Sequence, residues 1–308
     1  MAHMIAKTSD GKDAIAYVGE TPWHGLGQAL TSDAPLDVWA AESGLNFKLN
    51  TAPVEFLGGK QYGNRRVMYR EDNQTPLGVV SDRYKIVQPI EVLEFFRNMV
   101  GTVAHLETAG VLRDGAHYWA LARMDGEFSL AGDNVKQYLL LASSADGSLA
   151  TQARLTAVRV VCNNTLQMAQ RGAAEVVVRH TSVFNPGQVQ DKLAECNATF
   201  KAFADSARAL AAIKITADQA SKVFTKLLGG DEKKPSRAAT RALELFQGQG
   251  IGADLESASN TAWGALNAVT QLLDWETART QDARLRNAWF GGGVAIKQEA
   301  VTQLLELA

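Results

Sequence analysis

The sequence predicts an α+β protein: a mostly antiparallel β-sheet with hairpins and a packed helix, followed by an all-helical C-terminal region. Three observations support this fold class. Between residues 46 and 184, several segments alternate apolar and polar residues, which is the period of a strand. Two Asp-Gly pairs separate such segments and are strong hairpin signals. Beyond Asn185-Pro186 the apolar residues recur every three or four positions, as in a helix.

The first segment, residues 1–45, is expected to form an N-terminal arm with one short helix at Val38–Ala41. Asp37 suits the start of this helix, because a carboxylate there can cap it or favour its positive end. Gly44 suits its end, since glycine readily adopts the left-handed conformation of a helix C-terminus.

The second segment, residues 46–184, is expected to be the α+β core. Strand-like alternation begins at Phe47–Thr51 and recurs at Arg66–Arg70, and Leu77–Val80 is a further short apolar run. Pro89 suits the first position of a helix, whose apolar stripe extends to Val100.

Two hairpins are expected in the rest of this core. Asp114-Gly115 separates Val103–Leu112 from His117–Met124, and Asp146-Gly147 separates Tyr138–Ala142 from a strand that carries two arginines. A last alternating run follows at 175–181.

The third segment, residues 185–308, is expected to be helical. Asn185 and Pro186 suit the start of a long amphipathic helix over 186–213, and Thr216 with Gln219 matches a capping box. The seam of the long helix and the N-terminal arm both suggest self-association, because each offers apolar surface. The later helices are expected at Arg237–Phe246, Ala258–Thr280 and Ala295–Leu307.

The composition bounds the class of protein. The 308 residues include 46% hydrophobic and 21% charged residues, which is ordinary for a globular protein, and the net charge of −2 argues against a uniformly basic surface. The two cysteines, Cys162 and Cys196, are too few for a disulfide framework or a zinc knuckle. No apolar run reaches the roughly 18 residues of a membrane helix. We therefore expect a cytoplasmic protein.

Several segments together resemble the phage/plasmid-like protein family, a family of unknown function on mobile genetic elements. The resemblance implies a phage, prophage or plasmid origin and a bacterial host, and it supplies no established catalytic residues. The matching segments are Thr21–Gly27, Gly78–Gln88, Arg159–Thr165, Arg179–Thr181 and Thr261–Thr270.

Clustered cations suggest nucleic-acid binding. A sheet face that carries arginines beside tyrosines can follow a phosphate backbone and stack bases. One cluster lies in a single short β region, and the other follows the second Asp-Gly turn. The candidate residues are Lys60, Arg65, Arg66, Tyr69 and Arg70 in the first cluster, and Arg154, Arg159, Arg171 and Arg179 in the second.

A structural use of these cations is the more frequent one. Charged clusters are most often solvated faces, here with one internal ion pair. Arg154 and Arg159 have opposite strand parity, so a regular strand would point them to different faces. One of the two would then pair internally or lie at an oligomer contact.

Other chemistry is weakly supported. Trp23 and His24 lie in a turn-rich loop, where an anchoring or interface role is favoured over catalysis. Cys162 could pair with His180 as nucleophile and base, but a thiol that ends an apolar strand is usually a buried apolar group. Asn163 and Asn164 are interpreted as turn and helix-cap residues.

No metal, cofactor or small-molecule substrate is predicted, because the histidines have no ligand-like spacing. His105 and His117 flank a hairpin and could face each other across it. The glycines at 291–293, with Lys297 one helical turn later, could bind an anion, although a helix connection is the favoured use.

Three functional hypotheses follow. The first is a non-enzymatic nucleic-acid-binding protein, in its concrete form a single-stranded DNA binding or annealing protein that acts as an oligomer in recombination or replication. The second is a protein-interaction or host-factor-antagonist protein without nucleic-acid affinity. The third, an enzyme that uses Cys162 or His24, has the least support.

Overall fold

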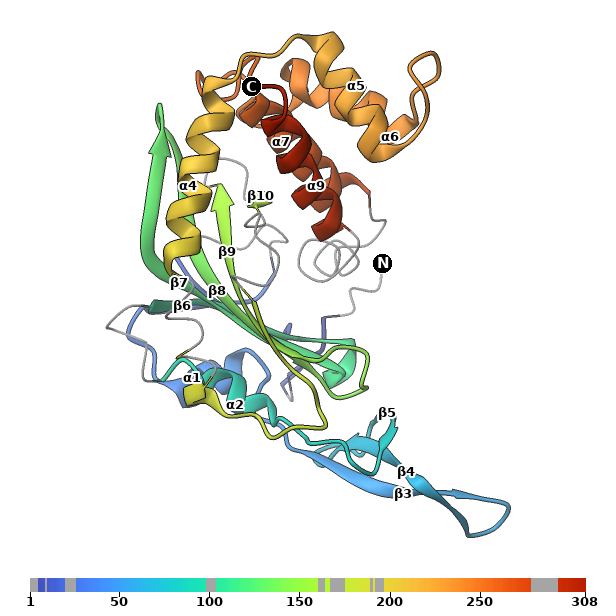
Figure 1. The fold of residues 1–308 in the computed structure, drawn as a ribbon. Coiled ribbons are helices and arrows are strands. Elements are labelled where there is room, and N and C mark those ends of the chain that lie inside the picture. The colour runs from blue at the N-terminus through green and yellow to red at the C-terminus, as the bar shows by residue number, and fades with distance from the viewer. Residues whose placement is uncertain are drawn as a thin grey trace. The chain divides into compact units, whose positions relative to one another are not determined.

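A computed structural model of the chain describes most of its residues (Figure 1). Packing divides the chain into two units. Unit 1 comprises residues 1–125, 138–154 and 175–194, and unit 2 comprises residues 126–137, 155–174 and 195–308. The described residues are 5–8, 10–19, 26–97, 104–159, 164–166, 175–188, 191, 197–277 and 293–308.

The larger sheet has the strand order β10-β9-β8-β7-β6-β1-β2, and β11 also pairs with β9. All pairs with an assigned register are antiparallel except β1 with β2, so the expected antiparallel α+β class is confirmed. The strands are β1 (Ile15–Val18), β2 (Gln28–Leu30), β6 (Ala104–Leu112), β7 (His117–Leu130), β8 (Asp133–Ser144), β9 (Thr151–Arg159), β10 (Asn164–Leu166) and β11 (Glu175–Val178).

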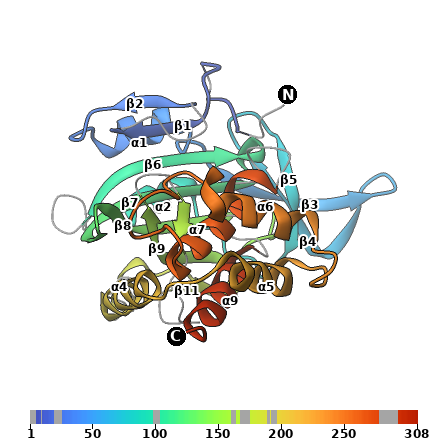
Figure 2. The same ribbon diagram turned by 90° about the horizontal axis from the view of Figure 1, so that it is seen from above.

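The N-terminal segment, which was expected to form an arm with one helix, also forms two strands. Its two strands join the larger sheet, where β1 pairs with β6. The helix α1 (Leu36–Glu42) forms as predicted, with Asp37 in its first turn and Gly44 beyond its end at φ +74°. Figure 2 shows α1 beside β1 and β2 within unit 1. The strands were missed because each is only three or four residues long and carries little periodicity.

Both predicted hairpins are confirmed. Leu112 pairs with His117 across a turn in which Asp114 has φ +56° and Gly115 has φ +116°. In the second, β8 and β9 are neighbours on either side of Asp146-Gly147, and Gly147 has φ +75°. Aspartate and glycine tolerate this left-handed backbone better than other residues do, so the turn chemistry fixed these connections.

Helix α2 (Pro89–Glu94) begins as predicted at Pro89. Gln88 and Glu91 form a reciprocal capping box that satisfies backbone N–H groups at this end. The helix ends at Glu94, before the predicted apolar stripe does, and Phe95 and Phe96 are buried beyond that end. The predicted end of the stripe at Val100 lies outside the described residues.

A second sheet in unit 1 has three antiparallel strands in the order β3-β4-β5. They are β3 (Leu49–Phe56), β4 (Lys60–Arg70) and β5 (Pro76–Ser81). Figure 1 shows β3 and β4 as a long two-stranded ribbon, in light blue, that extends past β5.

Unit 2 contains five described α-helices, and α7 lies among the others (Figure 2). Its ten residues are all buried and mostly apolar, which is expected of a central helix. The capping box of Thr216 and Gln219 is confirmed. The helices are α4 (Asn197–Ala212), α5 (Ala217–Leu228), α6 (Arg237–Glu244), α7 (Ala262–Gln271) and α9 (Gly293–Leu305).

A buried carboxylate ties the β7–β8 turn of unit 2 to α7. Asp133 is 1% exposed and accepts hydrogen bonds from Trp263 Nε1 at 3.0 Å and from Ser257 Oγ at 3.2 Å. A buried carboxylate must be compensated by donors, and these two side chains supply them.

Lys297 and Asp274 form a buried ion pair between α9 and the π-helical segment Leu272–Glu276 that follows α7. Their side chains are 1% and 5% exposed. Burial is the main cause of a lowered pKa for Lys297, and Asp274 opposes that shift. The idea that Lys297 helps bind an anion is therefore wrong, because its ammonium group is enclosed and neutralised by Asp274.

Replacing Asp274 should destabilise the fold. We expect Asp274→Ala to lower the free energy of unfolding by about 3–5 kcal/mol, because it leaves Lys297 buried without its counter-charge. The double variant Asp274→Leu/Lys297→Met should recover most of that loss. Urea unfolding followed by circular dichroism measures both values, and equal losses in the two variants would contradict the pairing.

Candidate nucleic-acid interface

The β3–β4 hairpin exposes apolar and cationic side chains together. Phe56 is 46% exposed, Leu57 82% and Tyr62 55%. Lys60 and Arg65 are exposed on the same strand as Tyr62. Exposed aromatic groups beside cations suit nucleic acid, since bases stack on rings while cations contact phosphates.

Leu57 occupies an unfavourable backbone conformation at the hairpin tip. Phe56 pairs with Lys60, so the loop comprises three residues, all with positive φ: Leu57 at +45°, Gly58 at +78° and Gly59 at +110°. The two glycines adopt this region at no steric cost, whereas a leucine there costs about 1–2 kcal/mol. An exposed apolar residue held in a costly conformation points to a use other than stability.

The two faces of β4 differ in exposure. Arg66, Met68 and Arg70 lie on one face, which becomes buried toward Met68 and Arg70. Arg65 and Tyr69 lie on the opposite face, because alternate residues of a strand point in opposite directions. Tyr69 is half-buried and Arg65 exposed, so this face places a cation and a ring on one side of the sheet.

The outer face continues on β5. Val67 pairs with Val79, which is 55% exposed, and Arg65 pairs with Ser81. Within the described part of the chain, Lys60, Arg65 and Arg66 form no ion pair. Lys60 and Arg65 are exposed, whereas Arg66 is half-buried and lies on the opposite face of β4 from Arg65.

Arg70 is a structural residue, and its prediction as a nucleic-acid contact is wrong. It is 8% exposed. Its guanidinium donates to both carboxylate oxygens of Asp72, at 2.6 and 3.0 Å, and to the carbonyl oxygen of Asp114 at 3.1 Å. It also lies 4.0 Å from the ring centroid of Phe47. These hydrogen bonds from Arg70 lower the pKa of Asp72.

The structure does not bring the four arginines of the second predicted cluster together into one surface. Arg154 is half-buried and donates to Gln152 Oε1 at 3.2 Å, and its backbone pairs with Glu175. Arg179 is exposed just after β11. Arg159 ends β9, where only its backbone is described, and it belongs to unit 2 while Arg154 belongs to unit 1. Arg171 lies outside the described residues.

Three of the predicted interface or structural residues, Trp23, His24 and Asn163, also lie outside the described residues, as does Cys162. Asn164 lies in strand β10 and pairs with Arg159. Its interpretation as a turn or helix-cap residue is therefore wrong, because its backbone extends the sheet.

His180 has no free ring nitrogen for general-base chemistry. It is 9% exposed, with Nδ1 3.1 Å from the carbonyl oxygen of Lys85 and Nε2 3.0 Å from that of Leu149. Its ring stacks on Tyr84, with centroids 4.3 Å apart. Tyr84 in turn donates to the carbonyl oxygen of Ser144 at 2.7 Å, and burial raises its pKa. This cluster joins separate chain segments rather than activating a nucleophile.

His117, Ser148 and Asp146 meet at the β8–β9 turn, but not as a catalytic triad. His117 Nε2 lies 2.7 Å from Ser148 Oγ and 3.5 Å from Asp146 Oδ2. A triad needs the carboxylate on the other ring nitrogen, where it orients the base. Burial would raise the pKa of Asp146, but hydrogen bonds from His117 and Ser148 outweigh it and hold this pKa well below 3.8.

The possible pairing of His105 with His117 is wrong, because His105 pairs with Arg123 across the hairpin. In the described ranges, no group of three His, Cys, Asp or Glu side chains is arranged to hold a metal ion. Nor is any helix described there both long and apolar enough to span a membrane.

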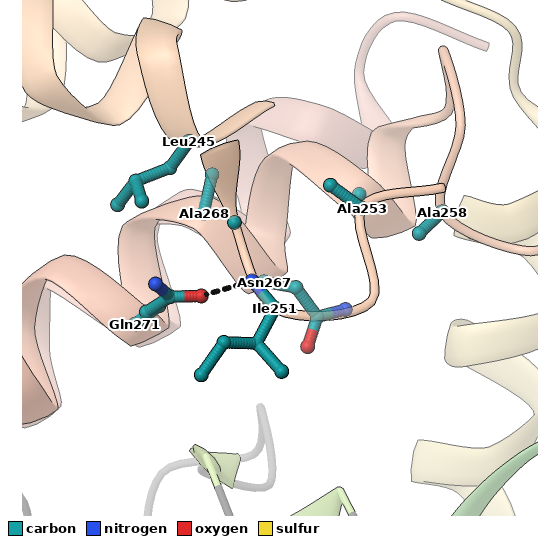
Figure 3. Close-up of a pocket in the computed structure, with 9 residues that line it drawn as sticks. Leu245, Ile251, Ala253, Ala258, Asn267, Ala268 and Gln271 are labelled. Carbon is teal, nitrogen blue, oxygen red and sulfur yellow. Dashed lines mark hydrogen bonds between the residues drawn. The ribbon is translucent and has the colours of Figure 1, made fainter. Parts of the chain in front are cut away.

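A small pocket lies in unit 2 beside α7 (Figure 3). Its cavity volume is about 10 Å³, and its lining includes Leu245, Ile251, Ala268 and no charged side chain. Gln271 faces it from α7, and its Oε1 accepts a hydrogen bond from the backbone N–H of Ile251 at 2.9 Å. Ligand pockets usually hold about 300–1,000 Å³ and place polar groups for the ligand, so this one is a packing gap.

The chain belongs to a family described as domain of unknown function (DUF932), which it matches over residues 76–289, more than half of its length. None of the curated proteins and none of the solved structures matches it. The matched range begins at β5, so the β3–β4 hairpin precedes it, whereas residues 83–85 and Arg179 lie within it.

Part of this surface lies outside the two cation clusters that the sequence predicts. Phe56 and Leu57 belong to no cation cluster, and their signal is the Gly58-Gly59 turn directly after an apolar pair. Arg83 and Lys85 belong to a segment that carries the family resemblance but to neither cation cluster, because Asp82 and Tyr84 interrupt the run of charge.

Leu57→Asn should stabilise the fold. Asparagine tolerates the left-handed region, so we expect the free energy of unfolding to rise by about 1 kcal/mol. Thermal and urea unfolding measure the change. Val183→Asn is the control, because Val183 is also exposed, at 76%, and its φ is not positive. A loss of stability in Leu57→Asn would mean that Leu57 contributes packing at the tip.

Asp146 should make the fold sensitive to acid. Its folded pKa lies below its unfolded value of 3.8, so its contribution is complete above pH 3.8 and is lost as the pH falls toward the folded pKa. We expect Asp146→Asn to flatten this decline in the free energy of unfolding, measured with urea between pH 6 and 2.5. The control is Asp205→Asn, whose exposed ion pair contributes little. Equal declines in wild type and Asp146→Asn would refute the assignment.

Proposed function

We propose that this protein binds single-stranded nucleic acid without catalysing a reaction, through the β3–β4 hairpin and the outer face of its three-stranded sheet. The observation that carries the proposal is the hairpin itself, where Phe56 and Tyr62 are exposed beside Lys60 and Arg65. Rings at this position offer stacking to unpaired bases of any identity, while the cations contact phosphates.

A single strand fits this surface better than a duplex does. The exposed rings can stack only on bases that are not already stacked inside a helix. The near-neutral net charge also favours a local cationic surface over a broad coat that tracks duplex DNA. The biological setting that we propose is replication or recombination of a mobile genetic element, in which the protein acts as an oligomer in the bacterial cytoplasm.

The second candidate function is a protein interaction without nucleic-acid affinity. Leu57 and Val79 favour it, because both are apolar and more than half exposed. An exposed apolar patch is typical of a protein-binding surface. The two candidates differ in their response to salt, since phosphate contacts weaken steeply with ionic strength and apolar contacts do not.

Removing the hairpin cations should weaken nucleic-acid binding. We expect Lys60→Ala/Arg65→Ala to raise the Kd for a labelled oligothymidine. The slope of log K against log salt should fall by about 1.4, because each of the two phosphate contacts on a single strand contributes about 0.7. Fluorescence anisotropy over a salt series measures both, and a sizing column reports the assembly that binds.

The control removes the same number of exposed cations from unit 2, in Lys222→Ala/Lys226→Ala, and should leave the slope unchanged. Tyr62→Phe should keep the affinity, whereas Tyr62→Ala should lose about 1–3 kcal/mol of stacking. No binding by the wild type at low salt would end the nucleic-acid proposal and leave the protein-interaction candidate.

A further inference from the structure

We propose that the nucleic-acid surface continues from the hairpin over Arg83, Lys85 and Arg179. One single-stranded nucleic acid would then extend from the hairpin tip to the end of β11. This inference rests on the proposed function. It adds the path of the nucleic acid and assigns base stacking and phosphate contacts to different ends of that path. All of these residues belong to unit 1, so their arrangement lies within one compact part of the chain.

Arg83 adjoins the β4 cations. Arg65 pairs with Ser81, the last residue of β5, and the backbone N–H of Asp82 donates to the carbonyl oxygen of Asn64 at 3.3 Å. Arg83 is the next residue and is exposed. The end of β5 therefore places Arg83 next to the strand that carries Arg65.

Lys85 joins this segment to Arg179. The backbone N–H of Lys85 donates to the carbonyl oxygen of His180, while the carbonyl oxygen of Lys85 lies 3.1 Å from His180 Nδ1. His180 is thus held against Lys85 by backbone and side chain together. Arg179, its neighbour in the chain, is exposed, as is Lys85, so the two cations lie on adjacent segments.

Tyr84 keeps these cations at the surface. Its ring packs on His180 and its hydroxyl donates to Ser144, so it anchors the segment while Arg83 and Lys85 on either side remain exposed. Tyr84 and His180 are therefore positioning residues, since neither presents a polar atom to solvent for a ligand. Fixing the backbone reduces the conformational entropy that the cations lose when they bind.

The charge along this path is strongly positive even though the whole chain carries −2. Residues 55–65, 81–85 and 179–180 contain five cations and two acids, Glu55 and Asp82. In the described part of the chain, the side chains of Arg83, Lys85 and Arg179 form no ion pair. A polyanion is the partner that this complementarity fits.

The two ends of the path differ in chemistry. Exposed rings occur at the hairpin end, in Phe56 and Tyr62, whereas the far end offers Arg83, Lys85 and Arg179 with the Tyr84 ring turned inward. The hairpin end therefore stacks bases and the far end contacts phosphates. A short oligonucleotide should satisfy the hairpin, and only a longer one should reach Arg179.

The test compares Arg83→Ala/Lys85→Ala/Arg179→Ala with the wild type. We expect unchanged thermal unfolding, because all three side chains are exposed. For an oligothymidine of about 30 nucleotides, the slope of log K against log salt should fall by about 2, and for one of about 8 nucleotides it should barely change.

The outcomes separate this inference from the proposed function. If the triple variant keeps the wild-type slope on the long oligonucleotide while the hairpin variant loses it, the extended path is wrong and the hairpin site stands. Equal slope losses on short and long oligonucleotides would also contradict the assignment of base stacking to the hairpin end and phosphate contacts to the far end. If the wild type binds neither oligonucleotide at low salt, or binds only an acidic protein, the proposed function itself fails.

Discussion

The contact between the three-stranded sheet and the β8–β9 turn is the constraint on which the rest of unit 1 depends. A Cβ on Gly78 would lie 2.9 Å from the Cα of Asp146, so only glycine permits β5 to approach this turn so closely. Tyr84 then reaches Ser144, and His180 bridges Lys85 and Leu149. Through these contacts one turn fixes β5, the segment after it and the end of β11, which are the parts that carry the candidate surface.

Charge is used in two distinct ways in this chain. The two lysine or arginine side chains buried in the described part of the chain each have a defined partner: Arg70 is enclosed by Asp72 and Phe47, and Lys297 by Asp274. Burying such groups is tolerated only because their charges are compensated. On the hairpin, by contrast, arginine and lysine are left to solvent beside exposed rings. A protein with almost no net charge can in this way concentrate positive charge on one surface.

The candidate site was only partly predictable, and Arg70 and Arg66 show why. They belong to the same strand and the same face, and the sequence treats them alike. The fold separates them, because Phe47 and Asp114 come from segments distant in the chain and cover Arg70 alone. The approach of Arg179 to Lys85 was equally hidden, since about ninety residues lie between the hydrogen-bonded Lys85 and His180. Sequence spacing carries no record of such long-range contacts.

The sequence by itself determined the α+β class, the two Asp-Gly hairpins and the starts of α2, α5 and the segment after Asn185. Each rests on local chemistry: the alternation of side chains, the left-handed backbone that Asp-Gly accepts, or a cap that satisfies backbone N–H groups. Only the tertiary structure decided that the N-terminal segment adds strands to the sheet, that Asn164 is a strand residue, and which cations are exposed. Burial and long-range pairing decide these features, and both depend on what the rest of the chain places beside a residue.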